Sequence, residues 1–517
     1  MAQQLQNITI AAPGFAGLNT QDSPIGVDPS FAAIADNCVI DKLGRIGARK
    51  GWETVTTNGS TVLGSSRGIE GIFEFVARDG TETVFSVGNN KIFTGTTTLA
   101  EVTLPSGYNI TANNWKIVSF NNNVHFYQRG HAPLVSTAGS TTLVLSAYTN
   151  TAPSPPVVTP APSGNEVLAA YGKLWVADLT GNKHTVYWSD TLLGNKFHGG
   201  VAGNLDVTLV WPTGFDEIVS LAAHNGFLII FGKQSILVYS GASSPASMTL
   251  EDTIEGVGCI ARDSVQHTGT DILFLSDAGV RNFGRTIQEK SMPMRDISRN
   301  VRNDLMEKVN VEQLPIKTVY SADEAFYLLS LPSTDTVYCF DMRGPIDQSG
   351  AHRATTWTEL DPLSFARLED KTIYIGKSTG IVKYAGYLDG TATYQLRYFS
   401  NPTDFGNASN LKFLKKFNLT IVGAHGTDIT LNWGYDYTDA YNKQAFTFSA
   451  SNAIAQYGVA EYAIAEYSGG IDALVNTPSV NTGGSGSIVT IGIEAQIDNV
   501  AFSIQKIDIH ALLGRLI

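Results

Sequence analysis

The sequence has little charge, few cysteines and no long apolar run. Only 16% of its 517 residues are Asp, Glu, Lys or Arg, whereas 50 residues are Gly and 10% are aromatic. Such a composition favours strands joined by glycine-containing turns over long charged helices. We therefore expect an all-β fold class, with room for about three domains or for one large repetitive architecture.

Basic side chains are also scarce relative to acidic ones. The chain contains 35 Lys and Arg against 47 Asp and Glu, a net charge of -12. A protein that coats nucleic acid or an anionic membrane uses a positive surface to attract phosphates. The charge balance therefore argues against whole-surface DNA binding.

The cysteines and the N-terminus indicate which compartment to expect. Cys38, Cys259 and Cys339 lie too far apart for a CxxC metal motif and are odd in number, so we expect buried thiols in a reducing compartment. No Lys or Arg precedes Lys42, and the longest apolar run, Phe227–Phe231, has five residues. The sequence therefore predicts a soluble, unexported protein with no membrane insertion.

A repeated unit occupies the middle of the chain. It consists of an apolar strand, a tight polar turn, a second apolar strand, another turn and a short strand that ends in an aromatic residue. The first turns fall near residues 80, 122, 172, 225, 269, 323 and 370, a mean spacing of about 48 residues. A propeller blade of four short strands needs about 40 to 50 residues. The repeat predicts a six- or seven-bladed β-propeller over 65–391; the alternative is a series of β-sandwiches with irregular hairpins.

Three regions of the chain do not follow the repeat pattern. Residues 1–64 have the Pro, Gly and Asp content of loops and predict an N-terminal arm. Residues 151–162 contain many prolines and predict a stiff polyproline linker between blades. Residues 392–517 alternate apolar and polar side chains and predict a C-terminal all-β platform domain resembling a β-sandwich.

The N-terminal arm ends in a compact basic hairpin within an acidic protein. Its candidate interface residues are Arg45, Arg49, Lys50 and Trp52. Trp and Arg are favoured at protein interfaces because one buries a large ring and the other offers a planar fork of donors. We expect this hairpin to contact a partner or a subunit rather than DNA; the alternative is a locally satisfied surface hairpin.

One helix is expected inside the propeller region. Ile297, Val301, Leu305 and Val309 recur every four residues after Asp296, so the pattern predicts an amphipathic helix over 297–310 with Asp296 as its N-cap. The other face carries basic residues, with one just ahead of the helix: Arg295, Arg299, Arg302 and Lys308. This face is either solvated or forms a subunit contact.

The sequence contains no convincing catalytic or metal-binding motif. Gly64–Gly68 fits a nucleophile elbow but runs into a predicted strand, and Gly376-Lys377-Ser378 lacks the first glycine of a phosphate loop. Ser276–Gly279 is typical of a blade turn. The nine His residues form neither HxH nor HExxH. We expect no enzymatic activity, cofactor or metal; the alternative is a propeller lectin or a glycoside hydrolase.

The two ends of the chain carry a family resemblance. Leu18–Asn37, followed by Gly44–Ile46 and Arg49–Trp52, is a Pro-punctuated, Asn-rich arm that leads into a basic hairpin, and Phe502–Arg515 is a closing strand. With a propeller between them, they resemble the tail nozzle proteins of short-tailed bacteriophages, also called tail tubular protein B or packaged-DNA stabilisation protein. The polyproline linker and the Tyr457–Tyr467 tandem depart from the family pattern.

The resemblance implies a structural virion protein, made in the host cytoplasm and located in the virion tail. Such a protein forms a homohexameric ring at the distal end of the tail. Its implied partners are a tail adaptor protein, a tail fibre or tailspike protein, and double-stranded DNA passing through the lumen. The charge distribution suits this role, because 68–391 holds 23 basic and 32 acidic residues, and an acidic or neutral wall would let DNA slide.

Overall fold

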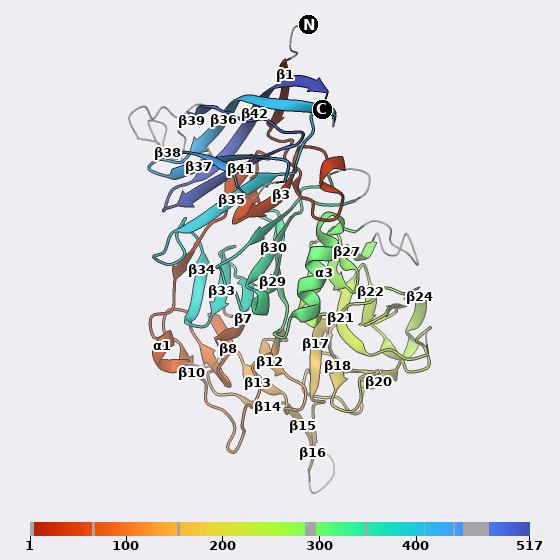
Figure 1. The fold of residues 1–517 in the computed structure, drawn as a ribbon. Coiled ribbons are helices and arrows are strands. Elements are labelled where there is room, and N and C mark those ends of the chain that lie inside the picture. The colour runs from red at the N-terminus through yellow and green to blue at the C-terminus, as the bar shows by residue number, and fades with distance from the viewer. Residues whose placement is uncertain are drawn as a thin grey trace.

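The computed structural model describes residues 5–64, 68–151, 156–212, 214–284, 296–346, 350–407, 409–437, 440–447 and 475–516. It confirms the all-β fold class and consists of a β-propeller with a β-sandwich at one end (Figure 1). None of the helices in these ranges is long and apolar enough to cross a membrane.

The first four blades each contain four antiparallel strands in chain order. Blade 1 comprises β7 (Ile69–Val76), β8 (Glu82–Gly88), β9 (Lys91–Thr94) and β10 (Ala100–Glu101). Blade 2 comprises β11 (Lys116–Phe120), β12 (Asn123–Tyr127), β13 (Leu134–Thr137) and β14 (Val144–Leu145). Blade 3 comprises β17 (Gly164–Ala170), β18 (Lys173–Leu179), β19 (Thr185–Trp188) and β20 (Gly203–Asp206). Blade 4 comprises β21 (Ile218–His224), β22 (Phe227–Gly232), β23 (Ser235–Ser240) and β24 (Thr249–Glu255).

The last three blades are less regular. Blade 5 has β25 (Gln266–His267), β26 (Ile272–Ser276) and β27 (Gly279–Asn282) among the described residues. Blade 6 has β28 (Lys317–Ser321), β29 (Phe326–Leu331), β30 (Thr336–Asp341) and β31 (Ala354–Trp357). Blade 7 has β32 (Ser364–Arg367), β33 (Ile373–Lys377) and β34 (Gly380–Tyr384), and its outer strand β6 (Trp52–Thr54) comes from the N-terminal region.

The propeller has seven blades, and the inner strands of the first and last lie together. The Ser364 hydroxyl on β32 donates a hydrogen bond to the Ile69 carbonyl on β7 at 2.8 Å. The pairing of β6 with β34 fastens the ring a second time, because β6 precedes blade 1 in the chain but completes blade 7. The seven predicted first turns are the hairpins between the first two strands of these blades. At one of them Asn225 and Gly226 both have positive φ, as a two-residue hairpin turn requires.

The sandwich combines strands from both ends of the chain. One sheet contains β36 (Asn410–Gly423), β42 (Phe502–Leu516), β1 (Leu5–Ala11), β4 (Cys38–Ile40), β5 (Ile46–Ala48), β39 (Val475–Asn476) and β40 (Ser479–Asn481). The other contains β2 (Gly17–Leu18), β3 (Phe31–Asp36), β35 (Tyr394–Ser400), β41 (Val489–Ile497), β37 (Asp428–Tyr435) and β38 (Asn442–Thr447), and β3 continues it into β31 of blade 6. Buried apolar side chains of both sheets share one core.

Residues 1–64 do not form the separate arm that the sequence predicts. From β1 to β5 their strands belong to the sandwich, and β6 belongs to the propeller. The alternation of Ile8 and Ile10 with the exposed Asn7 and Thr9 is the local pattern of a half-buried strand within β1. The pairing of Leu5 with Leu512 then makes this segment part of the C-terminal sheet.

The predicted polyproline linker is partly a hairpin. Strand β15 (Ala147–Asn150) pairs with β16 (Val157–Pro160), so the prediction of a stiff spacer over 151–162 is wrong for its second half. The β-branched residues of β16 favour a strand, and Pro160 is tolerated at its end because an edge position does not need its missing N–H. The hairpin projects from the propeller at the end opposite the sandwich (Figure 1).

The predicted helix begins later than expected. A 3-10 turn, η4 (Arg299–Val301), precedes helix α3 (Arg302–Val311), so Asp296 is not its N-cap. The Ile297 N–H instead donates to the Val280 carbonyl at 3.0 Å, and the Val280 N–H donates to the Ser298 hydroxyl at 2.9 Å. These contacts hold 297–298 against β27. The predicted apolar stripe is buried in the shared core. The other short helices that lie wholly within the described residues are α1 (Gly59–Val62), η1 (Pro24–Gly26), η2 (Pro245–Ser247), η3 (Arg262–Ser264) and η5 (Pro332–Thr334).

Candidate functional site

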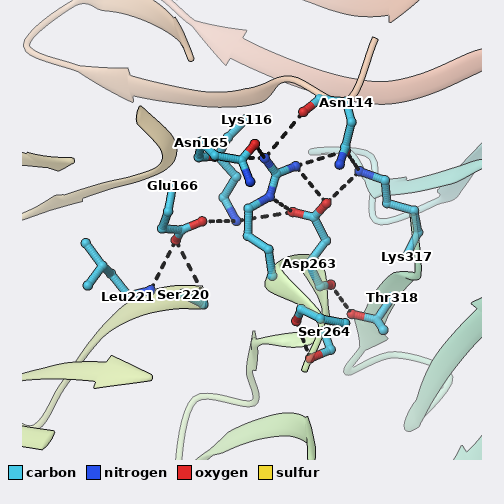
Figure 2. Close-up of polar contacts among 12 residues, drawn as sticks. Asn114, Lys116, Asn165, Glu166, Ser220, Leu221, Asp263, Ser264, Lys317 and Thr318 are labelled. Atoms are coloured by element: carbon cyan, nitrogen blue, oxygen red, sulfur yellow. Dashed lines mark hydrogen bonds and ion pairs between the residues drawn. The ribbon is translucent and has the colours of Figure 1, made fainter. Parts of the chain in front are cut away.

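Polar side chains gather where the inner strands meet at the propeller axis. We call this group the axial network: Asn114, Lys116, Asn165, Glu166, Arg262, Asp263 and Lys317. Lys116, Glu166 and Lys317 lie on the inner strands β11, β17 and β28, and Arg262 and Asp263 lie in η3 just before β25. Figure 2 shows that their side chains converge from different blades.

Asp263 is the centre of the axial network. Its carboxylate accepts two hydrogen bonds from the Arg262 guanidinium, at 2.9 and 2.8 Å. Lys317 Nζ donates to the Asp263 Oδ2 atom at 2.6 Å and to the Asn114 Oδ1 atom at 2.7 Å. Arg262 also donates to Asn165 Oδ1 at 2.9 Å. One carboxylate thereby connects blades 5 and 6, while Arg262 reaches blade 3 through Asn165 and Lys317 reaches the segment before blade 2 through Asn114.

Lys116 and Glu166 extend the axial network toward blade 4. Lys116 Nζ lies 3.6 Å from Asp263 Oδ1 and 3.7 Å from Glu166 Oε2. The other carboxylate oxygen of Glu166 accepts longer hydrogen bonds from the Ser220 hydroxyl at 3.4 Å and the Leu221 N–H at 3.3 Å (Figure 2). Glu166 is therefore held by weaker contacts than Asp263.

The protein shifts the pKa values of Asp263 and Glu166 in opposite directions. Burial alone would raise the pKa of Asp263, but the charges of Arg262, Lys317 and Lys116 outweigh it and hold this pKa well below its ordinary value. Burial raises the pKa of Glu166, with Lys116 opposing the shift. Burial also lowers the pKa of Lys317, against the attraction of Asp263. Asp263 is therefore ionised and serves as the anionic anchor of the cluster.

A small cavity of about 140 Å³ lies beside the axial network. Its lining comes from the inner strands of blades 1, 2, 5, 6 and 7 and includes Lys116, Asp263, Gln266 and Lys317. A DNA duplex is about 20 Å wide. The cavity is far too small for a duplex, so DNA cannot pass along the axis of a single propeller.

The basic hairpin predicted as an interface lies largely inside the chain. Arg49 is fully buried and donates to both carboxylate oxygens of Asp389, at 2.8 and 2.7 Å. It also donates to the Asn37 side chain at 2.8 Å and to the Thr358 carbonyl at 3.2 Å, and its guanidinium lies 4.2 Å from the centre of the Tyr394 ring. We call these five residues the arginine clamp. It ties the N-terminal region to blade 6 and to the start of the sandwich.

The other hairpin residues differ in exposure. Arg45 is buried and forms an ion pair with Asp41 at 2.5 Å, so the predicted partner contact is wrong for Arg45 and Arg49. Both guanidinium groups are held by this chain instead. Trp52 is half-buried in β6, with Lys377 Nζ 4.7 Å from the centre of its ring.

Lys50 is the most exposed of the three basic hairpin residues predicted to form the interface. Its side chain is 39% exposed and pairs with Glu324 at 2.7 Å. A partner contact by Lys50 therefore stays a prediction.

The basic residues around the predicted helix are only partly described. Arg302 pairs with the buried Asp296 carboxylate, and Lys308 lies 3.5 Å from Asp304. Arg299 is half-buried in η4. Arg295 lies outside the described residues, as does the Tyr457–Tyr467 tandem. A subunit contact by Arg299 and Arg302 stays a prediction.

Two of the three motifs rejected as catalytic lie at a strand end and in a turn of the propeller. Gly376 and Lys377 end β33, and Ser276–Gly279 forms the turn between β26 and β27. Ser65 lies outside the described residues. Within the described part of the chain, no group of three or more His, Cys, Asp or Glu side chains could hold a metal ion.

Sequence reasoning missed the axial network, although a signal was present. Lys116, Glu166, Ser220, Asp263 and Lys317 each lie four residues before the last residue of an inner strand. Alignment of the repeat on its turns emphasised Gly and Asn. Alignment on the inner strands would have shown a polar or charged residue at one equivalent position in five consecutive blades.

Comparisons with known proteins give no family. No protein-family model and no curated protein matches this chain. The extracellular domain of BT4673 from B. thetaiotaomicron is 11% identical with a TM-score of 0.40, and the match covers 73% of this chain and only 45% of that chain. The computationally designed Ika8 protein is 12% identical (TM-score 0.35; 68% of this chain, 94% of that chain), and the Pan2 WD40 domain of Neurospora crassa is 8% identical (TM-score 0.36; 65% and 95%). At such identities the similarity concerns the propeller-like fold alone.

Proposed function

We propose that this protein is the nozzle of a short bacteriophage tail: a structural virion protein that forms a homohexameric ring, retains packaged DNA and conducts it during ejection. One observation carries the proposal. The two chain segments that resemble tail nozzle proteins share one sheet, because β5 pairs with β42 through Ile46 opposite Ile504 and Gly47 opposite Ser503. The two segments that together resemble tail nozzle proteins are far apart in the sequence but lie side by side in one sheet of the sandwich.

The closed propeller axis supports a ring of several copies. The axial network occupies the centre of the propeller, and the cavity there holds about 140 Å³. A protein that conducts a duplex about 20 Å wide must therefore enclose it between subunits. This requirement agrees with a hexamer and assigns the propeller a scaffolding role.

The charge of the propeller region supports sliding rather than retention of DNA by basic side chains. Residues 68–391 hold 23 basic and 32 acidic residues. Each DNA phosphate that a Lys or Arg side chain neutralises adds a salt-dependent contribution to the affinity for DNA, so a basic lumen would slow a passing duplex. We propose an acidic or neutral lumen, with adaptor and tail fibre or tailspike proteins bound to other surfaces and with no enzymatic activity.

Electron microscopy of the purified protein tests this proposal. The expected result is a sixfold ring with a central opening wide enough for duplex DNA, formed by the protein alone or with its adaptor. Salt should change DNA passage only weakly. A stable monomer under assembly conditions that binds or cleaves polysaccharide would instead support the lectin or glycoside hydrolase alternative.

A further inference from the structure

Within the described ranges, strand β1 pairs along one of its two edges only. Its register with β42 is continuous, and the Ala12 N–H just beyond it donates to the Gln505 carbonyl at 2.9 Å. In an antiparallel pair, alternate residues direct their backbone groups to the partner strand and the intervening residues direct them away. Asn7 and Thr9 therefore direct N–H and C=O groups away from β42. Among the described residues, no other strand pairs with β1.

A groove of about 450 Å³ follows this edge. Three consecutive residues of β1 line it, which places it along the edge of the strand rather than over one face. The apolar part of the lining is Ile8, Ile25, Val27, Pro29 and Phe405. The polar part is Gln6, Asn7, Thr403, Asp404 and Gly406. Asp404 is the one charged residue of this lining.

The groove offers backbone hydrogen bonds, apolar surface and one negative charge together. Ile25 is 44% exposed although it lies beside Ile8 and Phe405 in the groove. Open strand edges readily pair with another chain, and proteins usually block them. Here Thr9 and Asn7, the outward residues, are uncharged, and the edge has neither the lysine nor the proline that commonly prevents strand addition.

We propose that the outer edge of β1 binds an extended segment of a partner protein by strand addition. The segment would pair with the backbone of Asn7 and Thr9, direct apolar side chains at alternate positions to Ile25 and Phe405, and place a basic side chain near Asp404. Main-chain pairing supplies affinity in this mode, and the side-chain contacts supply specificity. The inference does not depend on the proposed function, since it concerns one edge of the isolated chain.

Two synthetic heptapeptides test the proposal with the purified full chain. Both have the pattern Val-Thr-Val-Thr-X-Thr-Val, with X either Lys or Gln, and carry a fluorescent label for anisotropy measurements. We expect saturable binding, about tenfold tighter for the lysine peptide at low salt and nearly equal for the two at high salt, because salt screens the Asp404 charge. Equal affinities at low salt would overturn the role of Asp404.

Substitutions in the chain locate the binding edge. Asn7→Pro removes an outward N–H and leaves the bonds to β42 intact, so the variant should fold and bind at least about tenfold more weakly. Ile25→Asp should have a similar effect by placing a charge in the groove. Leu43→Asp is the matched control, because Leu43 is 46% exposed in the same sandwich but does not line the groove.

Three outcomes would overturn the proposal. The first is no saturable peptide binding to the folded wild-type chain. The second is binding that Asn7→Pro and Leu43→Asp change equally. The third is a concentration-dependent dimer of the protein alone that Asn7→Pro abolishes, which would make a second copy the occupant of this edge.

Discussion

The axial network and the arginine clamp both bury a guanidinium beside a carboxylate, but they balance charge differently. In the axial network, Asp263 forms ion pairs with Arg262, Lys317 and Lys116. In the arginine clamp, Arg49 and Asp389 form a one-to-one pair with two parallel hydrogen bonds. At the propeller centre, three basic side chains therefore share the Asp263 carboxylate as a counter-ion. At the junction with the sandwich, one arginine pairs with one carboxylate.

This difference determines which substitution is worst at each place. Removing one member of a buried pair leaves the other charge desolvated, and that uncompensated charge accounts for most of the cost. At the axis the most damaging loss is the Asp263 carboxylate, since Arg262 and Lys317 lose their counter-charge and Lys116 keeps only its contact with Glu166. At the clamp the two losses should be comparable, because each leaves one unpaired ion.

The largest effect is expected for Asp263→Asn. It leaves Arg262 and Lys317, both 7% exposed, without their shared anion. We expect the free energy of unfolding to fall by about 4 to 5 kcal/mol at pH 7, measured by chemical denaturation. A fall below about 1 kcal/mol would contradict the assignment of Asp263 as the anchor.

The pH dependence provides an independent check of Asp263. Its folded-state pKa is lowered, so its contribution to stability is complete above the ordinary carboxyl range and is lost as pH falls through the folded-state value. The stability difference between wild type and Asp263→Asn should therefore be constant near neutrality and shrink below about pH 4. A constant difference at all pH values would indicate a packing effect instead.

A somewhat smaller effect is expected for Arg49→Met. The substitution leaves the Asp389 carboxylate, 9% exposed, without its partner and removes the bonds to Asn37 and Thr358. We expect a loss of about 3 to 4 kcal/mol in the free energy of unfolding. Arg49→Lys is the control. It keeps the positive charge but lacks the planar set of donors that binds both carboxylate oxygens, so it should recover only part of the lost stability. Full recovery would show that charge alone matters there.

The same contrast explains what the sequence could and could not predict. Each blade of the propeller forms mainly from contiguous residues, so turns such as Asn225-Gly226 appear in the sequence at the blade period. The sandwich depends on pairs such as Leu5 with Leu512, which no local pattern identifies. For that reason residues 1–64 look like loops in the sequence, whereas six strands, β1 to β6, lie within residues 5–54 of the structure.

Charged residues at the two sites were predictable to different extents. The sequence indicates Arg49 as an interface anchor because of its residue type and its hairpin, but its partner Asp389 is 340 positions away, and only the fold brings the two together. The sequence therefore predicts a partner or subunit contact for this arginine. No local pattern indicates Asp263 or Glu166, since isolated carboxylates in a β-rich sequence resemble solvated turn residues until the blades are aligned on their inner strands.

A small effect is expected for Glu166→Gln, which sharpens the comparison within the axial network. Burial raises the pKa of Glu166, so the folded state favours its neutral form and loses stability as pH rises through the raised value. The glutamine variant does not titrate, and at pH 7 we expect it to lie within about 1 kcal/mol of wild type. Its stability relative to wild type should increase from pH 4 to pH 7. A decrease over that range would show that Lys116 needs Glu166 as an anion.

The smallest effect on stability is expected for Lys50→Ala, at the exposed end of the basic hairpin. Lys50 and Glu324 are 39% and 34% exposed, and surface pairs of this kind contribute about 0.2 to 1 kcal/mol. Lys91→Ala is the matched control, because Lys91 is also 39% exposed and pairs with Glu101 in blade 1. Both variants should unfold within about 1 kcal/mol of wild type in denaturant.

The two lysine variants separate intramolecular from intersubunit roles. Stability cannot distinguish them, so the measurement is the concentration at which the proposed ring dissociates, followed by mass photometry. If Lys50 also contacts a neighbouring copy, Lys50→Ala should raise that concentration while Lys91→Ala leaves it unchanged. Equal behaviour would mean that the whole basic hairpin, like Arg49, acts only within its own chain.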